Sequence, residues 1–492
     1  MNERILDLAV ALGLWLILAL APLKWGLPLL EPGRMPLPQS GLEWAVGSWP
    51  IEAFCLAVYF LFFLQCMAIL SRGIFPRMRP ALVALGPILF MAMAHLSSRC
   101  GFQTATSNSS NLLYAAYVLL FLLLVWRCEL HHFLCSALIV SMGVVSLIAV
   151  FQRFFGFAQT SQWASIYFAG NSHIAQMQAK LKSGRVFSTL VYPNSLGGYL
   201  VMTLPLSMVW WWKGLREVRS RRALVGSMVT IFAVGVLYLL VSLDSPDAWI
   251  HGRWYGIFFL GAIAAPCTGL FALFLSRSQG SILVFAGLAL FIALYLWLRR
   301  RTDHRRGVGL ALAGLLSVAG VLLGTDLVAR HLKWDTLLMR WSYWVAAFKM
   351  GLSRWWLGYG PGSFGAVYPR FKLDWGGQTQ LAHSHVLQVF AELGIVGVAG
   401  WLWWWMGWIV LPGHREDRSA SDDFLRWVRW GATLGLIAFL LHGFLDFDFY
   451  VPGIAIQACF LNACVWRDHL VTGTKCMNLS TASRRIPARE EP

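Results

Sequence analysis

Long apolar runs alternate with short polar loops along most of the chain. Thirteen such runs fall near residues 5–22, 51–70, 81–96, 112–126, 133–155, 194–212, 223–243, 255–275, 282–298, 308–327, 384–410, 431–447 and 451–466. A helix needs about 20 mostly apolar residues to cross the hydrocarbon core of a bilayer, and these runs approach that length. The pattern predicts an all-α, polytopic transmembrane helical bundle, with the first run kept as a span because no convincing small-residue cleavage site follows it.

The loops between the runs differ in charge, and that difference predicts their side of the membrane. Basic residues crowd into 71–80, 213–222, 299–306 and 413–429, which the positive-inside rule places in the cytoplasm with the N-terminus and the polar tail 467–492. The long loops 23–50, 156–193 and 328–383 then face outward. Three runs lie between the cytoplasmic loops 213–222 and 299–306, but an odd number of crossings cannot join two loops on the same side of the membrane. We therefore expect about twelve spans, with one run between 194 and 298 failing to cross.

Composition supports this class and narrows the partners. Hydrophobic residues make up 58% of the 492 residues and charged residues only 13%, against about 25% charged in a soluble domain. The formal net charge of +17 lies largely in the short loops, where it meets anionic lipid heads, so membrane lipid is expected as a partner and nucleic acid is not. The nine cysteines show no CxxC spacing, so neither a disulfide framework nor a metal site is indicated.

Ionisable side chains in or beside membrane spans are costly, and each is a candidate for function. Those at the outward loops and run ends are Arg185, Arg277, Arg340, Arg370, His383, His385, Glu392, His442 and Asp446. An isolated arginine can also simply reach the lipid head groups, and an exposed loop charge needs no function. The candidates therefore have to be judged by their spacing and neighbours.

The stretch LAHSHVLQVFAELGIVG (381–397) separates two kinds of polar residue. His385, Gln388 and Glu392 share one face of a helix, where inward polar packing explains them. His383 lies about 200° of helical turn away from His385, so a His-x-His metal clip is not expected on a regular helix. At the junction of loop and helix, His383 is the residue best placed for chemistry.

Three further local features carry expectations. Asn194 follows Pro193 at a helix start and reads as a helix cap. His442 and Asp446 are four residues apart and could form a hydrogen bond along a helix. Arg340 shares a helix face with Tyr343, Ala347 and Met350, and that helix leads to GYGPGSF, a tight turn that lacks the GK[ST] of a nucleotide-binding loop.

These pieces, in this order, resemble the bacterial O-antigen ligase and O-antigen polymerase superfamily over roughly residues 184–466. The resemblance rests on Arg185 with Pro193 and Asn194, on Ser276 with Arg277, and on Arg340 with Gly358, Gly360, Phe364 and Tyr368. It closes on His383, Leu387, Gln388, Glu392, Gly394 and Gly397, with Ser384 where the family usually has asparagine. The resemblance implies a division of the chain into three parts. These are N-terminal transmembrane helices (1–193), a ligase-like catalytic region with the periplasmic loop 328–383 (194–466), and a cytoplasmic tail (467–492).

The resemblance implies a GT-C-like fold and glycosyl transfer at the periplasmic face of the bacterial inner membrane. The donor would be a glycan on undecaprenyl diphosphate. The acceptor would be a sugar hydroxyl of lipid A core for a ligase, which is the favoured reading, or of another lipid-linked glycan for an O-antigen or exopolysaccharide polymerase. No metal and no cofactor are implied.

Residue chemistry agrees with that implication. Arginines suit a departing diphosphate, and histidine suits an acceptor hydroxyl that must lose a proton near neutral pH. We assign His383 to catalysis and Arg185, Arg277, Arg340 and Arg370 to the diphosphate, with Asn194, Tyr368, His385, Gln388, Glu392, His442 and Asp446 in support. A transporter of polysaccharide or lipid-linked glycan, and a non-catalytic membrane scaffold, are the alternatives. The chain lacks the inverted repeats and paired broken helices typical of transporters.

Overall fold

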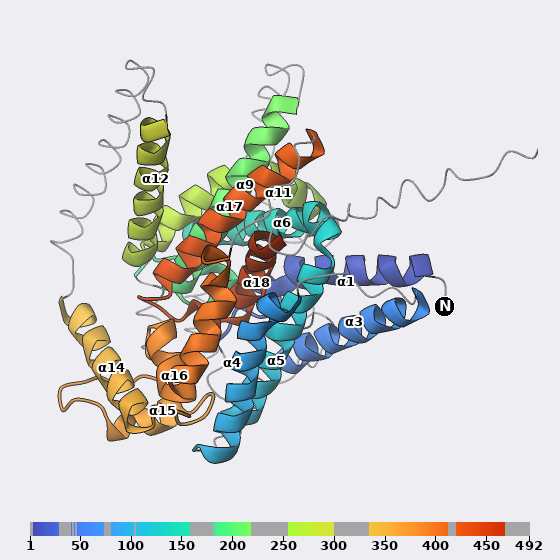
Figure 1. The fold of residues 1–492 in the computed structure, drawn as a ribbon. Coiled ribbons are helices and arrows are strands. Elements are labelled where there is room, and N and C mark those ends of the chain that lie inside the picture. Colours follow the sequence, from blue (N-terminus) through green and yellow to red (C-terminus); the bar gives the residue numbers. More distant parts are fainter. Residues whose placement is uncertain are drawn as a thin grey trace, which may run out of the picture.

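The computed structural model describes residues 3–28, 41, 44, 47–72, 80–102, 105–157, 181, 183–217, 254–299, 334–411 and 420–467 (Figure 1). All regular elements in these ranges are helical. The long helices are α1 (Glu3–Lys24), α3 (Ile51–Arg72), α4 (Pro80–Cys100), α5 (Ala105–Trp126), α6 (His131–Phe151), α9 (Pro193–Glu217), α11 (Trp254–Ser276), α12 (Gln279–Arg299), α14 (Trp334–Ser353), α16 (His385–Met406), α17 (Ala420–His442) and α18 (Pro452–Trp466). The short helices used below are α15 (Phe364–Val367), η6 (Tyr368–Arg370) and η8 (Asp448–Tyr450).

Six of the described helical stretches are long and apolar enough to cross a membrane. They are Ile5–Lys24, Ile51–Ser71, Leu82–Cys100, Ser107–Trp126, Cys128–Gly156 and His385–Ile409, and shorter apolar stretches occur at Ala265–Ser276, Gln279–Ala293 and Pro452–Trp466. The chain is thus an all-helical membrane protein in its described part. The runs 223–243 and 308–327 and the tail from 468 lie outside the described residues, so the number of twelve spans stays a prediction.

Helix α18 forms the centre of the bundle. All 15 of its residues are buried, as expected for a helix that is apolar on every side, and it contacts α1, α5 and α17 (Figure 1). Phe449, just before α18, lies among the rings of Phe90, Tyr117, Trp404 and Trp405. The tightest neighbours around this centre are α6 with α11, α9 with α17, and α4 with α16.

Several helix ends that were predicted to face outward meet at one end of the bundle. Arg185 Nε donates to the carbonyl of Ser276 at 3.0 Å, which joins the approach to α9 to the end of α11. The backbone of His385, at the start of α16, donates to Gly443 just after α17 at 2.7 Å. Since α9 begins and α11 ends here, their directions alternate. The run 223–243 lies outside the described residues, so the run that fails to cross between 194 and 298 stays a prediction.

The long loop before α16 is ordered around α14, which packs along α16. Ala346, Ala347 and Met350 of α14 are fully buried against Phe364 and Tyr368 of the following short helices. The predicted helix face that carries Ala347 and Met350 together with Arg340 is therefore confirmed. Residues 334–383 form a compact cap that lies against one side of the bundle (Figure 1).

Helix α16 is interrupted within its length. Gly394 adopts φ 68° and ψ −172°, a region that essentially only glycine occupies. The glycine-rich turn docks at this break: Gly360 N donates to Glu392 O at 2.8 Å and Ile395 N donates to Trp355 O at 2.7 Å. The break thus gives the turn free backbone groups to bind.

Candidate functional site

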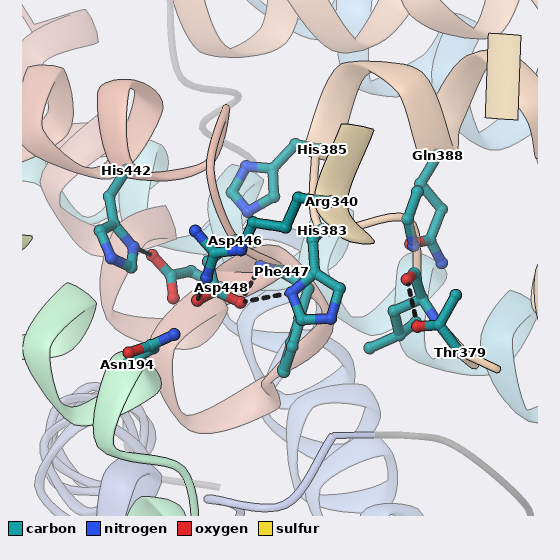
Figure 2. A network of polar contacts seen from close by, with 12 residues as sticks. Asn194, Arg340, Thr379, His383, His385, Gln388, His442, Asp446, Phe447 and Asp448 are labelled. Atoms are coloured by element: carbon teal, nitrogen blue, oxygen red, sulfur yellow. Dashed lines mark hydrogen bonds and ion pairs between the residues drawn. The ribbon is translucent and has the colours of Figure 1, made fainter. Parts of the chain in front are cut away.

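The site centres on His383 and Asp446, which come from separate parts of the chain. His383 lies between the cap and α16, and Asp446 lies in the turn that follows α17. His383 Nδ1 is 3.3 Å from Asp446 Oδ1, and the amide of Phe447 donates to the same oxygen at 3.0 Å (Figure 2). The Asp446 side chain is 2% exposed, whereas that of His383 is 24% exposed. The imidazole is therefore partly exposed while its carboxylate partner is enclosed.

Arginines surround this pair. Arg340 Nη2 lies 3.4 Å from Asp446 Oδ2, and Arg185 Nη2 donates to Asn194 Oδ1 at 2.8 Å. Burial lowers the pKa of Arg185, the carboxylate of Asp446 opposes that effect, and the charges of Arg277 and Arg340 lower it further. Two of the other three predicted arginines, Arg277 and Arg340, thus lie within electrostatic range of Arg185.

A cavity of about 420 Å³ opens beside the pair. Its polar lining includes Arg185, Asn194, Gln378, Gln380, His383 and Asp446. A space of this size suits part of a glycan or a diphosphate head group, since ligand pockets commonly measure about 300–1,000 Å³. The cavity therefore joins a histidine, a carboxylate and an arginine in one compartment.

The charges fix the protonation of the carboxylate. Burial alone would raise the pKa of Asp446, but the hydrogen bond and charge of His383, together with the charge of Arg340, hold that pKa well below its ordinary value. An ionised carboxylate can only accept hydrogen bonds, so Nδ1 of His383 carries a proton and donates it. In the neutral ring Nε2 is then the nitrogen with a free lone pair, as a general base requires.

Packing and backbone contacts set the orientation of His383. Its ring stacks on Tyr343, with centroids 5.7 Å apart and planes 25° apart, and meets the edge of Phe447 at 4.9 Å. Its carbonyl accepts a hydrogen bond from Trp344 Nε1 at 3.1 Å. The preceding amide, of Ala382, donates to Gln388 Oε1 at 2.9 Å. Two ring contacts and two backbone contacts, from α14, α16 and the turn after α17, therefore hold His383 in place.

The predicted inward-facing position of the polar residues on α16 is confirmed. His385, Gln388 and Glu392 are each 1% exposed, and His385 Nε2 accepts from Phe449 N at 2.9 Å. Gln388 Nε2 donates to Glu392 Oε1 at 3.3 Å, and Phe364 N donates to that same oxygen at 3.3 Å. Gln388 and Glu392 thus tie the cap to α16 at Ala382 and Phe364, whereas His385 contacts the segment before α18 and not His383.

Two of the expected local contacts are wrong. His442 does not bond the side chain of Asp446: α17 ends at His442, so the four-residue spacing no longer runs along a helix, and the ring bonds Asp448 instead. Asn194 does not precede its helix as a cap, because α9 begins one residue earlier, at Pro193. Proline suits that first position, and Asn194 is left to accept from Arg185.

Three other predicted residues lie away from the cavity lining. Arg277 sits in the turn between α11 and α12 with an exposed side chain and φ 49°. Arg370 is exposed and stacks over Phe102, 5.4 Å from its ring centre. Tyr368 is fully buried in the cap, where its hydroxyl donates to Gly377 O at 2.7 Å. Of these three, Arg277 retains an electrostatic link to the site through Arg185.

The sequence reading missed several contributors. Gln378 and Gln380 line the cavity, and Tyr343 stacks on the catalytic candidate. Uncharged polar residues in a polar loop give no periodic signal, so pattern alone could not single out the glutamines. Tyr343 was placed on the correct helix face, but its histidine partner lies 40 positions further along the chain.

Comparison with known proteins finds a likeness for one part of the chain. No curated protein matches the chain. Residues 264–402 match the family model described as O-antigen ligase, a stretch that contains Arg277, Arg340 and His383. The described part of the chain is therefore that of a membrane protein, and residues 264–402 are similar to the O-antigen ligase family, which supports the resemblance to the O-antigen ligase and polymerase superfamily.

Proposed function

We propose that the protein is an inner-membrane glycosyltransferase of the O-antigen ligase type, which moves a glycan from undecaprenyl diphosphate to a sugar hydroxyl at the periplasmic face. The observation that carries this proposal is the His383–Asp446–Arg340 cluster at a cavity that Arg185 also lines. The family match supports the lipid-linked glycan class of substrate.

In the proposed reaction, Nε2 of His383 takes the proton of the acceptor hydroxyl while that oxygen bonds to the anomeric carbon of the donor. The bond from this carbon to the diphosphate oxygen breaks, and undecaprenyl diphosphate leaves. Asp446 stabilises the imidazolium that forms, as a buried carboxylate does behind a catalytic histidine. Arg185, Arg277 and Arg340 stabilise the charge that develops on the leaving group. We leave Arg370 out of this step because it faces Phe102.

The proposal is tested first with purified protein and an undecaprenyl-diphosphate-linked glycan. His383→Ala should lower the rate of transfer by about 100-fold or more, the usual contribution of a positioned general base. The control is His95→Ala, which removes an exposed imidazole from α4 and should leave the rate unchanged. Full transfer by His383→Ala would exclude the assigned role.

The acceptor is tested by deleting the gene in its host and analysing the glycans. Loss of long-chain lipopolysaccharide with lipid-linked polymer retained indicates a ligase. Accumulation of single repeat units indicates a polymerase, the alternative within the same superfamily. Lipid-linked glycan trapped on the cytoplasmic side would instead indicate a transporter.

A further inference from the structure

A second polar network includes the residues on both sides of the Asp446 turn and is fully buried. Ser278 Oγ is 2.8 Å from Ser281 Oγ, and Ser281 Oγ is 2.9 Å from His442 Nε2. The other ring nitrogen, Nδ1 of His442, lies 2.5 Å from Asp448 Oδ2 (Figure 2). All four side chains are 1% exposed or less.

In either protonation state of His442, Nδ1–H donates to the carboxylate of Asp448. With a neutral ring, Nε2 accepts from the hydroxyl of Ser281, whose oxygen accepts from Ser278; with a protonated ring, Nε2–H donates to Ser281, which donates to Ser278. The Ser-His-Asp order resembles a nucleophilic triad. Ser281 is 0% exposed, however, so no substrate carbon can reach its oxygen. The network therefore has the geometry of a triad without access for a substrate.

The network joins two turns that carry proposed site residues. Ser278 directly follows Arg277 in the turn between α11 and α12. At the other end, His442 and Asp448 bracket the turn that contains Asp446. The carbonyl of His442 also accepts from the amide of Asp446 at 3.0 Å. The side chain and the backbone of His442 thus fix the same turn.

Helix α9 makes room for this network with two consecutive glycines. A Cβ on Gly197 would lie 2.3 Å from Ser281 Oγ, and one on Gly198 would lie 2.4 Å from Asp448 Oδ2. Real Cβ atoms do not come that close, so any larger residue would displace the network. The pair Gly197–Gly198 is therefore a specific feature of the site end of α9.

We propose that the buried network Ser278–Ser281–His442–Asp448 is a positioning unit that holds the Arg277 turn in register with the Asp446 turn. This inference rests on the proposed function. In that reaction the unit would keep Arg277, which stabilises the diphosphate, aligned with Asp446, which supports the histidine that activates the acceptor. None of the four residues touches substrate. Their effect reaches the reaction through Arg277 and Asp446.

Hydrogen–deuterium exchange tests the coupling without any reaction. Ser281→Ala removes the central hydroxyl and should speed amide exchange both in 277–282 and in 445–449. Ser207→Ala is the matched control, since it removes a similarly buried hydroxyl whose one bond among the described residues is to the Leu204 carbonyl of its own helix. Faster exchange in 277–282 alone, in neither segment, or equally with Ser207→Ala would overturn the proposal.

Kinetics then test the consequence for transfer. Ser281→Ala should lower kcat about tenfold, the cost of leaving a buried group unpaired. In an Arg277→Ala background the same change should cost no more than about twofold, because residues that act through one another are not additive. His442→Asn keeps a donor for Asp448 and loses the link to Ser281. It should therefore lower kcat by about the same factor as Ser281→Ala. A full tenfold loss in both backgrounds would contradict the coupling.

The exchange experiment and the kinetic experiment together distinguish an error in the positioning role from an error in the proposed function. If the wild-type protein transfers glycan and Ser281→Ala behaves like Ser207→Ala, the positioning role is wrong and the proposed function stands. If the two turns are coupled in exchange but the wild-type protein transfers nothing from the lipid-linked donor, the proposed function is wrong and the structural coupling stands.

Discussion

His383 combines an unusual backbone with a fixed side chain. Its φ of 52° is left-handed, a conformation that costs a non-glycine residue about 1–2 kcal/mol. The contacts of its carbonyl with Trp344 and of its ring with Tyr343 and Phe447 offset that cost. A histidine held in this way keeps its ring orientation before substrate binds, which reduces the ordering that the transition state requires.

Asp446 gives a pH test at the scale of one residue. Its pKa is depressed from an ordinary value of 3.8, so its ionic contacts stabilise the folded state fully above that value. The stabilisation is lost only as the pH falls below 3.8 toward the depressed folded-state pKa. Asp446→Asn should therefore lower the melting temperature of the purified protein at pH 5–8.

The measurement is a comparison of thermal melts for wild type and Asp446→Asn at successive pH values. The gap between the two melting temperatures should narrow only below about pH 4, where the carboxylate of the unfolded chain takes up its proton. A gap that has already closed by pH 5 would show that the pKa of this carboxylate is not depressed.

Sequence reasoning found His383 but not its partner. The loop-to-helix position of His383 follows from the local pattern around residues 381–397. Its contact with Asp446 spans 63 positions and depends on how α16 packs beside the end of α17. The four-residue spacing of His442 and Asp446 suggested a different pair, because pattern alone does not reveal that α17 ends at His442.

At the scale of elements, the break in α16 links the cap to the bundle. The apolar run 384–410 predicts one continuous helix, but the polar face of that helix extends only as far as Glu392. Beyond that point Gly394 redirects the backbone and exposes groups that bind the turn at Trp355 and Gly360. The pattern Glu-x-Gly thus combines a buried polar anchor with a backbone break.

Gly394→Ala should destabilise the protein strongly. A Cβ at this position would lie 2.3 Å from the carbonyl oxygen of Trp356, and the backbone region is closed to alanine. We expect a loss of about 1–3 kcal/mol or more, with a lower melting temperature and easier proteolysis of the cap. The control is Gly287→Ala in α12, where no described residue lies within 4 Å of the added Cβ and alanine favours the helix.

Equal melting temperatures for Gly394→Ala and Gly287→Ala would show that α16 can run through the break as a regular helix. The docking of the glycine-rich turn would then not depend on Gly394.

At the scale of the molecule, the site is made where helix ends from distant segments meet. The hydrophobic pattern predicted which ends face outward, and the contacts at Ser276, His385 and Gly443 agree in bringing such ends together. The pattern could not predict which side chains would line the cavity, because that depends on lateral packing of helices. Arg185 reaches the cavity and Arg370 does not, although both are arginines of predicted outward loops.

This arrangement predicts that the cap and the cavity share one side of the membrane, opposite the basic loops. In a cysteine-free background, Trp375→Cys places one thiol on the exposed surface of the cap. It should react with a membrane-impermeant maleimide in cells whose outer membrane alone is permeable. His304→Cys, in the basic loop 299–306, should react only after the inner membrane is opened, because the positive-inside rule retains such loops in the cytoplasm. Retained glycan transfer would show that the labelled variants are folded. Labelling of the loop without the cap in intact inner membranes would invert the topology, and the acceptor would then have to be cytoplasmic.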